Sequence, residues 1–178
     1  SPDGSKVLFI REVKPYDHSG PMDVFVVRTD GSGLVRLNPP GTTSGLEAQS
    51  WSPDGRQVAF VAAKGSFWDD DRAVFVANAD GTDAHRITPW SVTYRAEWSP
   101  DGRRIAFDHQ TFAATGWDVW VMNADGSRAK PLVKSRADDQ GPAWSPDGRS
   151  IAFGSELNAE PGYDHVWTIG ADGSRPRR

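Results

Sequence analysis

The pentapeptide Trp-Ser-Pro-Asp-Gly recurs at a nearly constant spacing along the 178-residue sequence. It begins at Trp51, Trp98 and Trp144, 47 and 46 residues apart, and the chain opens on Ser-Pro-Asp-Gly at residues 1–4. In each full copy a Phe lies nine residues after the Trp, and a later Asp-Gly pair recurs in all four copies. A period of about 40 to 50 residues is typical of the blades of a β-propeller. The sequence therefore contains four copies of one structural unit.

Each copy predicts four short strands joined by tight turns. The first strand leads into the Trp, and the Pro of Ser-Pro-Asp-Gly presets φ for the second position of a type I turn. Two apolar strands follow, separated by a loop of variable length, and Asp-Gly, a strong hairpin signal, leads into the fourth strand. The predicted second strands are 7–10, 58–61, 105–107 and 151–153, the third strands are 24–27, 74–77, 119–122 and 166–169, and the fourth strands end at Leu37, Ile87 and Leu132.

The second and third strands are apolar at both odd and even positions, which predicts that both faces of each sheet are covered. Radially stacked blades provide such cover, whereas a β-sandwich, the alternative, does not require a repeat of 46 to 51 residues. We therefore predict an all-β fold, a β-propeller of four-stranded antiparallel blades at residues 1–46, 47–93, 94–139 and 140–178. The first and last blades are incomplete, so we expect that the four blades do not close and that the terminal blades allow self-association.

Composition excludes several classes of function. The chain has no Cys, which excludes thiol catalysis and Cys-ligated zinc. Its net charge of −4 argues against a nucleic-acid partner, and its apolar runs are far shorter than the roughly 20 residues that cross a bilayer. The sequence contains neither Gly-x-Ser-x-Gly nor a phosphate-binding Gly-x-x-x-x-Gly-Lys-Ser/Thr motif. We therefore predict no catalytic residue, no cofactor, no metal and no membrane span.

The repeat resembles a known family. Trp-Ser-Pro-Asp-Gly-Arg-Arg-Ile-Ala-Phe at residues 98–107, followed by Asp-Val-Trp-Val-Met-Asn-Ala-Asp-Gly-Ser at 118–127, is similar to the WD-like repeat of the TolB-type β-propellers. The similarity covers nearly the whole chain and implies a propeller of more than four blades, usually six. It also implies a non-enzymatic binding or scaffolding role, because periplasmic TolB binds an outer-membrane lipoprotein.

The resemblance leaves other functions open. Similar blades occur in prolyl-oligopeptidase-type and tricorn-type peptidases, so one alternative is the propeller portion of a larger hydrolase, where it gates substrate. A metal-bearing, polysaccharide-active propeller is a third. The resemblance implies a periplasmic or extracellular location and leaves the cytoplasm open.

The two ends of the predicted blades differ in sequence. The Ser-Pro-Asp-Gly and Asp-Gly turns share one end, the turn end, whereas the loops of variable length lie at the other, the loop end. Variable loops on a rigid scaffold often carry binding sites, and the Trp and Tyr residues that the repeat does not require fall there, beside a run of Asp. We predict a protein-binding face at the loop end, although these rings could instead cover blade edges. Its residues are Trp68, Trp90, Trp117, Tyr16, Tyr94, Tyr163, Asp69, Asp70 and Asp71.

The invariant residues of the repeat are predicted to be structural. They are Trp51, Trp98, Trp144, Asp54, Asp101, Asp147, Gly55, Gly102 and Gly148. Three His residues directly follow an Asp, at 17–18, 108–109 and 164–165. Because the repeat does not place these pairs at equivalent positions, we interpret them as surface loop residues.

Overall fold

The computed structural model describes residues 1–12, 22–65, 71–91, 93–110, 116–133, 135, 137–156 and 165–178, with the backbone alone at 45–48. These residues form fourteen strands, every pair of neighbouring strands is antiparallel, and no helix is present among them. No segment of the described chain is therefore a helix that could cross a membrane. The predicted all-β fold is confirmed.

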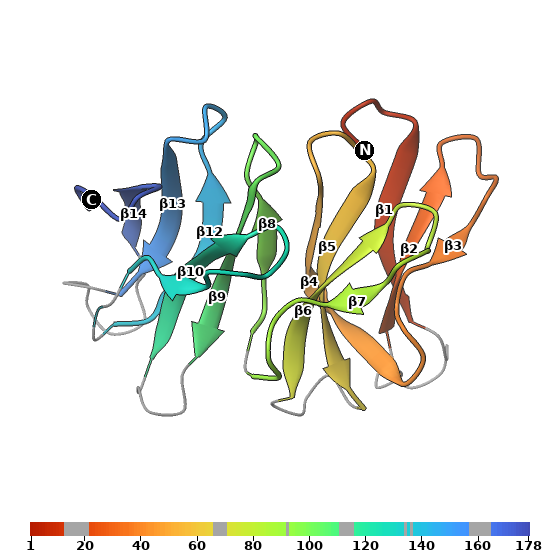
Figure 1. Ribbon diagram of the computed structural model, residues 1–178, viewed down its shortest axis with the longest axis horizontal. Coiled ribbons are helices and arrows are strands. Elements are labelled where there is room, and N and C mark those ends of the chain that lie inside the picture. The colour runs from red at the N-terminus through yellow and green to blue at the C-terminus, as the bar shows by residue number, and fades with distance from the viewer. Residues whose placement is uncertain are drawn as a thin grey trace.

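The strands group into four blades that lie side by side (Figure 1). Blade I contains β1 (Lys6–Glu12), β2 (Met22–Arg28) and β3 (Val35–Arg36). Blade II contains β4 (Thr42–Trp51), β5 (Gln57–Lys64), β6 (Arg72–Asn78) and β7 (His85–Arg86). Blade III contains β8 (Ala96–Trp98), β9 (Arg104–Gln110), β10 (Trp117–Asn123) and β11 (Lys130–Pro131). Blade IV contains β12 (Asp139–Trp144), β13 (Ser150–Ser155) and β14 (His165–Gly170).

The first and last blades each have three strands, as the repeat predicts. Blade I shares one sheet with blade II through a single pair, Met22 with Ser44, and a bridge between Thr168 and Arg177 adds a short fourth edge to blade IV. β4 begins at Thr42 and β12 at Asp139, ahead of the predicted copy boundaries at residues 47 and 140. In the described residues no strand of blade I pairs with a strand of blade IV, so no strand pairing joins the first blade to the last.

Every blade has two distinct faces, which we name by their central residues. The Phe face of blade II carries Phe60 and Phe75, and the opposite Val face carries Ala59, Val61, Val74 and Val76. The side chains from Val58 to Ala63 are all completely buried, because both faces of β5 are covered by neighbouring blades. This explains why the sequence is apolar at both parities.

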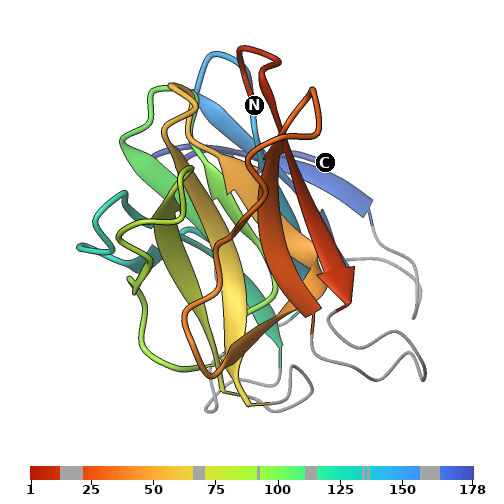
Figure 2. The same cartoon turned by 90° about the vertical axis from the view of Figure 1, so that its right-hand side faces the viewer.

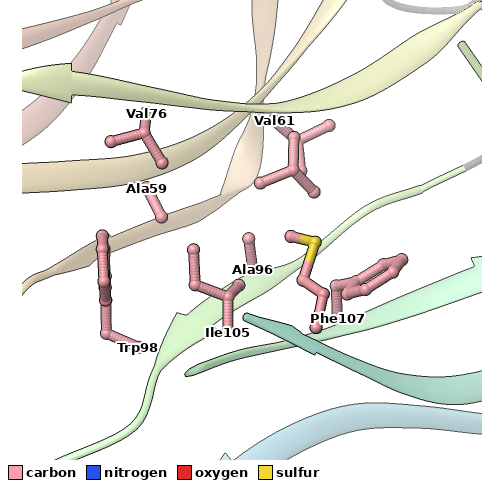
Figure 3. Packing of buried hydrophobic residues seen from close by; sticks show 9 residues of the cluster. Ala59, Val61, Val76, Ala96, Trp98, Ile105 and Phe107 are labelled. Atoms are coloured by element: carbon pink, nitrogen blue, oxygen red, sulfur yellow. The ribbon is translucent and has the colours of Figure 1, made fainter. Parts of the chain in front are cut away.

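The three interfaces between blades repeat one packing pattern. The Val face of blade I packs on the Phe face of blade II, and the Val face of blade II packs on the Phe face of blade III. Figure 3 shows the second of these interfaces, where Trp98, Ile105 and Phe107 meet Ala59, Val61 and Val76. The Val face of blade III packs in the same way on Trp144, Ile151 and Phe153 of blade IV.

The Ser-Pro-Asp-Gly turns have one geometry throughout the chain. The N–H of Gly102 donates to the Ser99 carbonyl oxygen at 2.9 Å, which is the hydrogen bond of a type I turn. Asp101 Oδ1 accepts hydrogen bonds from the Ser99 hydroxyl at 2.6 Å and the Arg103 N–H at 3.1 Å. Gly102 has a φ of 68°, a region that favours glycine, and Gly55 and Gly148 match it at 68° and 67°. These contacts account for the recurrence of Ser, Asp and Gly.

The repeat Trp residues lie between blades. Trp98 and Trp144 are buried in the interfaces that follow blades II and III, and Trp51 packs at the edge of the interface between blades I and II. The Trp144 indole N–H donates to the Glu97 carbonyl oxygen of the preceding blade at 3.2 Å. Each of these rings therefore joins its own blade to the one before it.

Candidate functional site

The structure describes four of the nine residues predicted for the binding face. Trp90, Tyr94, Trp117 and Asp71 are described, and all four lie at the loop end, before β6, before β8 or at the start of β10. The other five predicted residues lie outside the described residues. They are Trp68, Asp69, Asp70, Tyr16 and Tyr163.

Tyr94 and Trp117 form an aromatic pair across blade III. Their ring centroids are 4.8 Å apart and their planes are tilted by 53°. The guanidinium of Arg72, at the start of β6, lies 4.1 Å from the centre of the Tyr94 ring. Arg72 is buried, whereas both rings are only half-buried. Part of each ring is therefore exposed to solvent, and Arg72 of blade II packs against the Tyr94 ring.

Carboxylates hold the backbone of both aromatic residues. Asp108 Oδ1 accepts hydrogen bonds from the backbone N–H groups of Tyr94 and Arg95, each at 2.9 Å. Asp138 Oδ1 accepts one from the backbone N–H of Trp117 at 3.0 Å. These bonds therefore fix the backbone of both aromatic residues.

Asp108 and His109 are not surface loop residues, so our interpretation of that pair was wrong. They lie on β9, and the Asp108 side chain is buried. Burial raises the pKa of Asp108, while hydrogen bonds from Tyr94, Arg95 and Gly141 act in the opposite direction. One feature of the sequence indicates that Asp108 is buried. It directly follows the repeat Phe, and the equivalent residue of blade II, Val61, is buried.

His109 continues this polar cluster beneath the aromatic pair. Its Nδ1 atom lies 3.2 Å from the Ser91 hydroxyl oxygen, and its ring lies edge-on to Trp120 with centroids 4.9 Å apart. Burial lowers the pKa of His109, which favours the neutral ring. Ser91 in turn exchanges backbone hydrogen bonds with Arg72 at 2.9 and 2.7 Å. The cluster therefore links blades II and III at the loop end.

Trp90 does not join the aromatic pair. Its ring packs 5.9 Å from Phe75, the Arg86 guanidinium lies 4.7 Å from its centre, and it borders the core between blades I and II. Trp117 instead contacts Tyr94 on blade III. The structure therefore places two of the predicted Trp residues in separate contacts, and Trp90 fits the alternative in which a ring covers a blade edge.

Acidic residues near the pair have contrasting environments. Asp71 is exposed, and its carbonyl oxygen accepts a hydrogen bond from the Lys64 N–H at 3.0 Å. Asp139 is buried, and neither of its carboxylate oxygens has a hydrogen-bond donor in bonding geometry among the described residues. Burial raises the pKa of Asp139, against the opposing influence of the Ser155 and Ser135 hydroxyls.

Within the described ranges no three His, Asp or Glu side chains are grouped as metal ligands.

This fold defines a β-propeller, and comparison with solved structures identifies its type. The chain has the TolB-type fold: it matches a protein assigned as TolB from Agrobacterium tumefaciens with a TM-score of 0.74 and 23% identity over 99% of its length. It matches TolB from Acinetobacter baumannii with a TM-score of 0.70 and 16% identity over 98% of its length. The chain spans 61% and 41% of the lengths of these two proteins.

Other propellers show the same fold at lower identity. A structure of the nidogen/laminin complex matches 97% of the chain with a TM-score of 0.68 and 11% identity, and the match spans 60% of that protein. Enzyme structures follow, including the tricorn protease and a manganese-bound oligogalacturonate lyase, with TM-scores of 0.63 and 0.62. No protein-family model and no curated protein sequence matches the chain.

Proposed function

We propose that this chain is a non-enzymatic propeller that binds a protein partner at its loop end, with Tyr94 and Trp117 at the centre of the contact. The observation that carries the proposal is the aromatic pair itself, in which two half-buried rings 4.8 Å apart are supported by buried Arg72 and Asp108. Tyr and Trp are enriched among the residues that dominate binding energies at protein interfaces.

The contacts that hold the Tyr94 and Trp117 rings in place favour tight binding of a partner. A partner that orders flexible side chains loses about 0.5 to 1.5 kcal/mol for each one immobilised. The Tyr94 ring contacts the Trp117 ring and the Arg72 guanidinium before binding, so we expect that loss to be small here. The exposed carboxylate of Asp71 adds negative charge at the same end, and we propose that the acidic run 69–71 steers a basic partner.

The comparisons support a binding role without assigning the partner. Propellers of this fold include TolB proteins and a member of the nidogen/laminin complex. By analogy with TolB we propose a periplasmic or extracellular location. The similarity to the tricorn protease favours a second candidate, in which the same loop end gates substrate to a hydrolytic domain of a longer polypeptide.

Site-directed photo-crosslinking in the source cell tests the proposal. A photoreactive phenylalanine analogue replaces Tyr94 in one variant and Arg103, an exposed residue of the turn end, in a matched control. We expect one discrete protein crosslinked through position 94 and not through position 103. Crosslinks of equal yield at both positions, or a small peptide substrate trapped at position 94, would contradict the binding role.

A further inference from the structure

The turns of the turn end carry a chemically reactive dipeptide. An Asp is followed directly by a Gly at eight places, two in each copy of the repeat, and all eight Asp residues are exposed. Three of the hairpins that carry such a pair, from β4 to β5, β8 to β9 and β12 to β13, lie at the upper end of the molecule in Figure 1 and in Figure 2. The eight pairs are residues 3–4, 30–31, 54–55, 80–81, 101–102, 125–126, 147–148 and 172–173.

An exposed Asp-Gly pair is prone to spontaneous isomerisation, because glycine has no Cβ to hinder the reaction. The Gly nitrogen attacks the carbon of the protonated Asp carboxyl group, a C–N bond forms, the nitrogen loses its proton and water leaves, which gives a succinimide ring. Water then adds to the former main-chain carbonyl carbon and opens the ring to isoaspartate. The reaction therefore requires a Gly nitrogen that is free to lose its proton and a protonated carboxyl group that is free to rotate toward it.

The Gly nitrogen is engaged in all eight turns. Its N–H donates to the carbonyl oxygen three residues earlier at 2.8 to 2.9 Å. Gly81, for example, donates to Asn78 at 2.8 Å, and Gly126 donates to Asn123 at 2.9 Å. This hydrogen bond closes the turn. It must break before the nitrogen can lose its proton and attack.

The Asp carboxylate is engaged as well. In every turn its Oδ1 atom accepts the backbone N–H two residues later, at 2.8 to 3.1 Å. Hydroxyl groups add a further bond, as that of Thr82 does to Asp80 at 2.6 Å. These bonds, the hydroxyl first, lower the pKa of all eight carboxyl groups. A smaller fraction of each group is therefore in the reactive, protonated form.

We propose that these hydrogen bonds suppress isoaspartate formation in the folded chain, and that the eight Asp-Gly pairs become modification sites when the chain unfolds. The bonds that build each turn thus also protect it. Isoaspartate adds one carbon atom to the backbone within the turn, so a modified pair cannot re-form the same hydrogen bonds. The modification therefore accumulates in chains that have unfolded and impairs their refolding.

Ageing the whole chain in the folded state and in denaturant tests this proposal. Both samples are kept at one temperature and one mildly acidic pH and are then digested. Liquid chromatography with electron-transfer mass spectrometry quantifies isoaspartate at each pair. We expect every pair to convert at least about tenfold more slowly in the folded chain, because both reacting groups are engaged there. Equal rates in the two samples would overturn the proposal.

A surface variant separates the effect of the hydrogen bonds from that of folding. Thr82 is exposed, so Thr82→Ala removes the hydroxyl bond to Asp80 without disturbing the core. Thr82→Ser is the matched control, because Ser32 makes the equivalent bond to Asp30 at 2.7 Å.

We expect Thr82→Ala to raise the folded-state rate at Asp80 at least about threefold, and Thr82→Ser to keep the wild-type rate. The rate at Asp125 of the same molecules should stay unchanged. Far-ultraviolet circular dichroism verifies that both variants are folded. An unchanged rate at Asp80 in Thr82→Ala, or an equal rise at Asp125, would overturn the protective role of the hydrogen bonds.

Discussion

The buried carboxylate of Asp108 accepts a hydrogen bond from the backbone N–H of Tyr94 at 2.9 Å. The two residues are 14 apart in the sequence and lie on β9 and on the connection into β8. One side chain of the blade therefore fixes the position of an aromatic ring that we propose to contact a partner. Four predictions can be tested on the purified chain, and two tests require the partner.

Replacing Asp108 by Ala is expected to destabilise the chain. The partly buried N–H groups of Tyr94 and Arg95 lose their shared acceptor, and we expect a total loss of about 1 to 3 kcal/mol. Asp108→Asn is the matched control, because its amide oxygen can accept the same two bonds and burial already disfavours the charged form. Denaturant unfolding measures both variants, and equal losses for Ala and Asn would show that charge, and not hydrogen bonding, is what this position supplies.

Replacing Asp139 by Asn is expected to stabilise the chain at pH 7 by about 1 kcal/mol, because among the described residues no donor is aligned with its buried carboxylate. The pKa of Asp139 is raised in the folded state, so the folded chain binds more protons than the unfolded chain between the two pKa values. Wild-type stability therefore falls as pH rises through that window, from about 3.9 upward. The Asn variant lacks this fall. Thermal unfolding at several pH values measures the difference, which should shrink at acidic pH; a gap independent of pH would contradict the role of the charge.

The turn-end carboxylates are expected to give the opposite pH dependence. Hydrogen bonds from Ser hydroxyls first, and then from backbone N–H groups, lower the pKa values of Asp54, Asp101 and Asp147. A lowered pKa contributes stability that is present above the unfolded value of about 3.9 and is lost as pH falls through the folded value. The triple Asn variant should be less stable at pH 7 and lose less stability on acidification. An acid-unfolding profile parallel to that of wild type would disprove this.

Glycine substitutions separate backbone strain from steric conflict. Gly102→Val forces a branched residue to a φ of 68° with no contact closer than 3.5 Å at its Cβ, so strain alone should cost about 1 to 3 kcal/mol. Gly126→Ala adds a clash between the new Cβ and the Ile87 carbonyl oxygen, and we expect it to cost more although Ala is smaller. Denaturant unfolding compares the two, and a milder effect at Gly126 would contradict the packing seen between blades II and III.

Partner affinity should be the same for folded Gly102→Val and wild type, because Gly102 lies at the turn end. A folded Gly102→Val chain without binding would place the functional surface at that end of the blades.

The repeat predicts the strands because the chemistry of each position recurs in every blade. Val58 to Ala63 must be apolar at both parities since neighbouring blades cover both faces of β5, and this pattern is visible in the sequence. The role of Asp108 is not visible in the same way. Its partners Tyr94 and Arg95 belong to a connection of irregular length, so no periodicity brings them together in advance.

The same limit applies to the surplus Trp residues. Trp90 and Trp117 have the same residue type and lie at the same end of the blades, but one packs on Phe75 and the other on Tyr94. The difference depends on where the connection between β7 and β8 crosses the blade edges. The repeat does not specify that path, and the structure does.

The most direct test of loop-end binding is the affinity of the crosslinked partner, purified and titrated by calorimetry against three variants. Tyr94→Ala and Trp117→Ala are each expected to weaken binding by about 2 kcal/mol, or roughly 30-fold, as aromatic residues at an interface centre do. Trp90→Ala should instead lower the melting temperature and leave the affinity of the folded chain unchanged, because its ring packs on Phe75 and Arg86. Unchanged affinity for both Tyr94→Ala and Trp117→Ala would contradict binding through the aromatic pair.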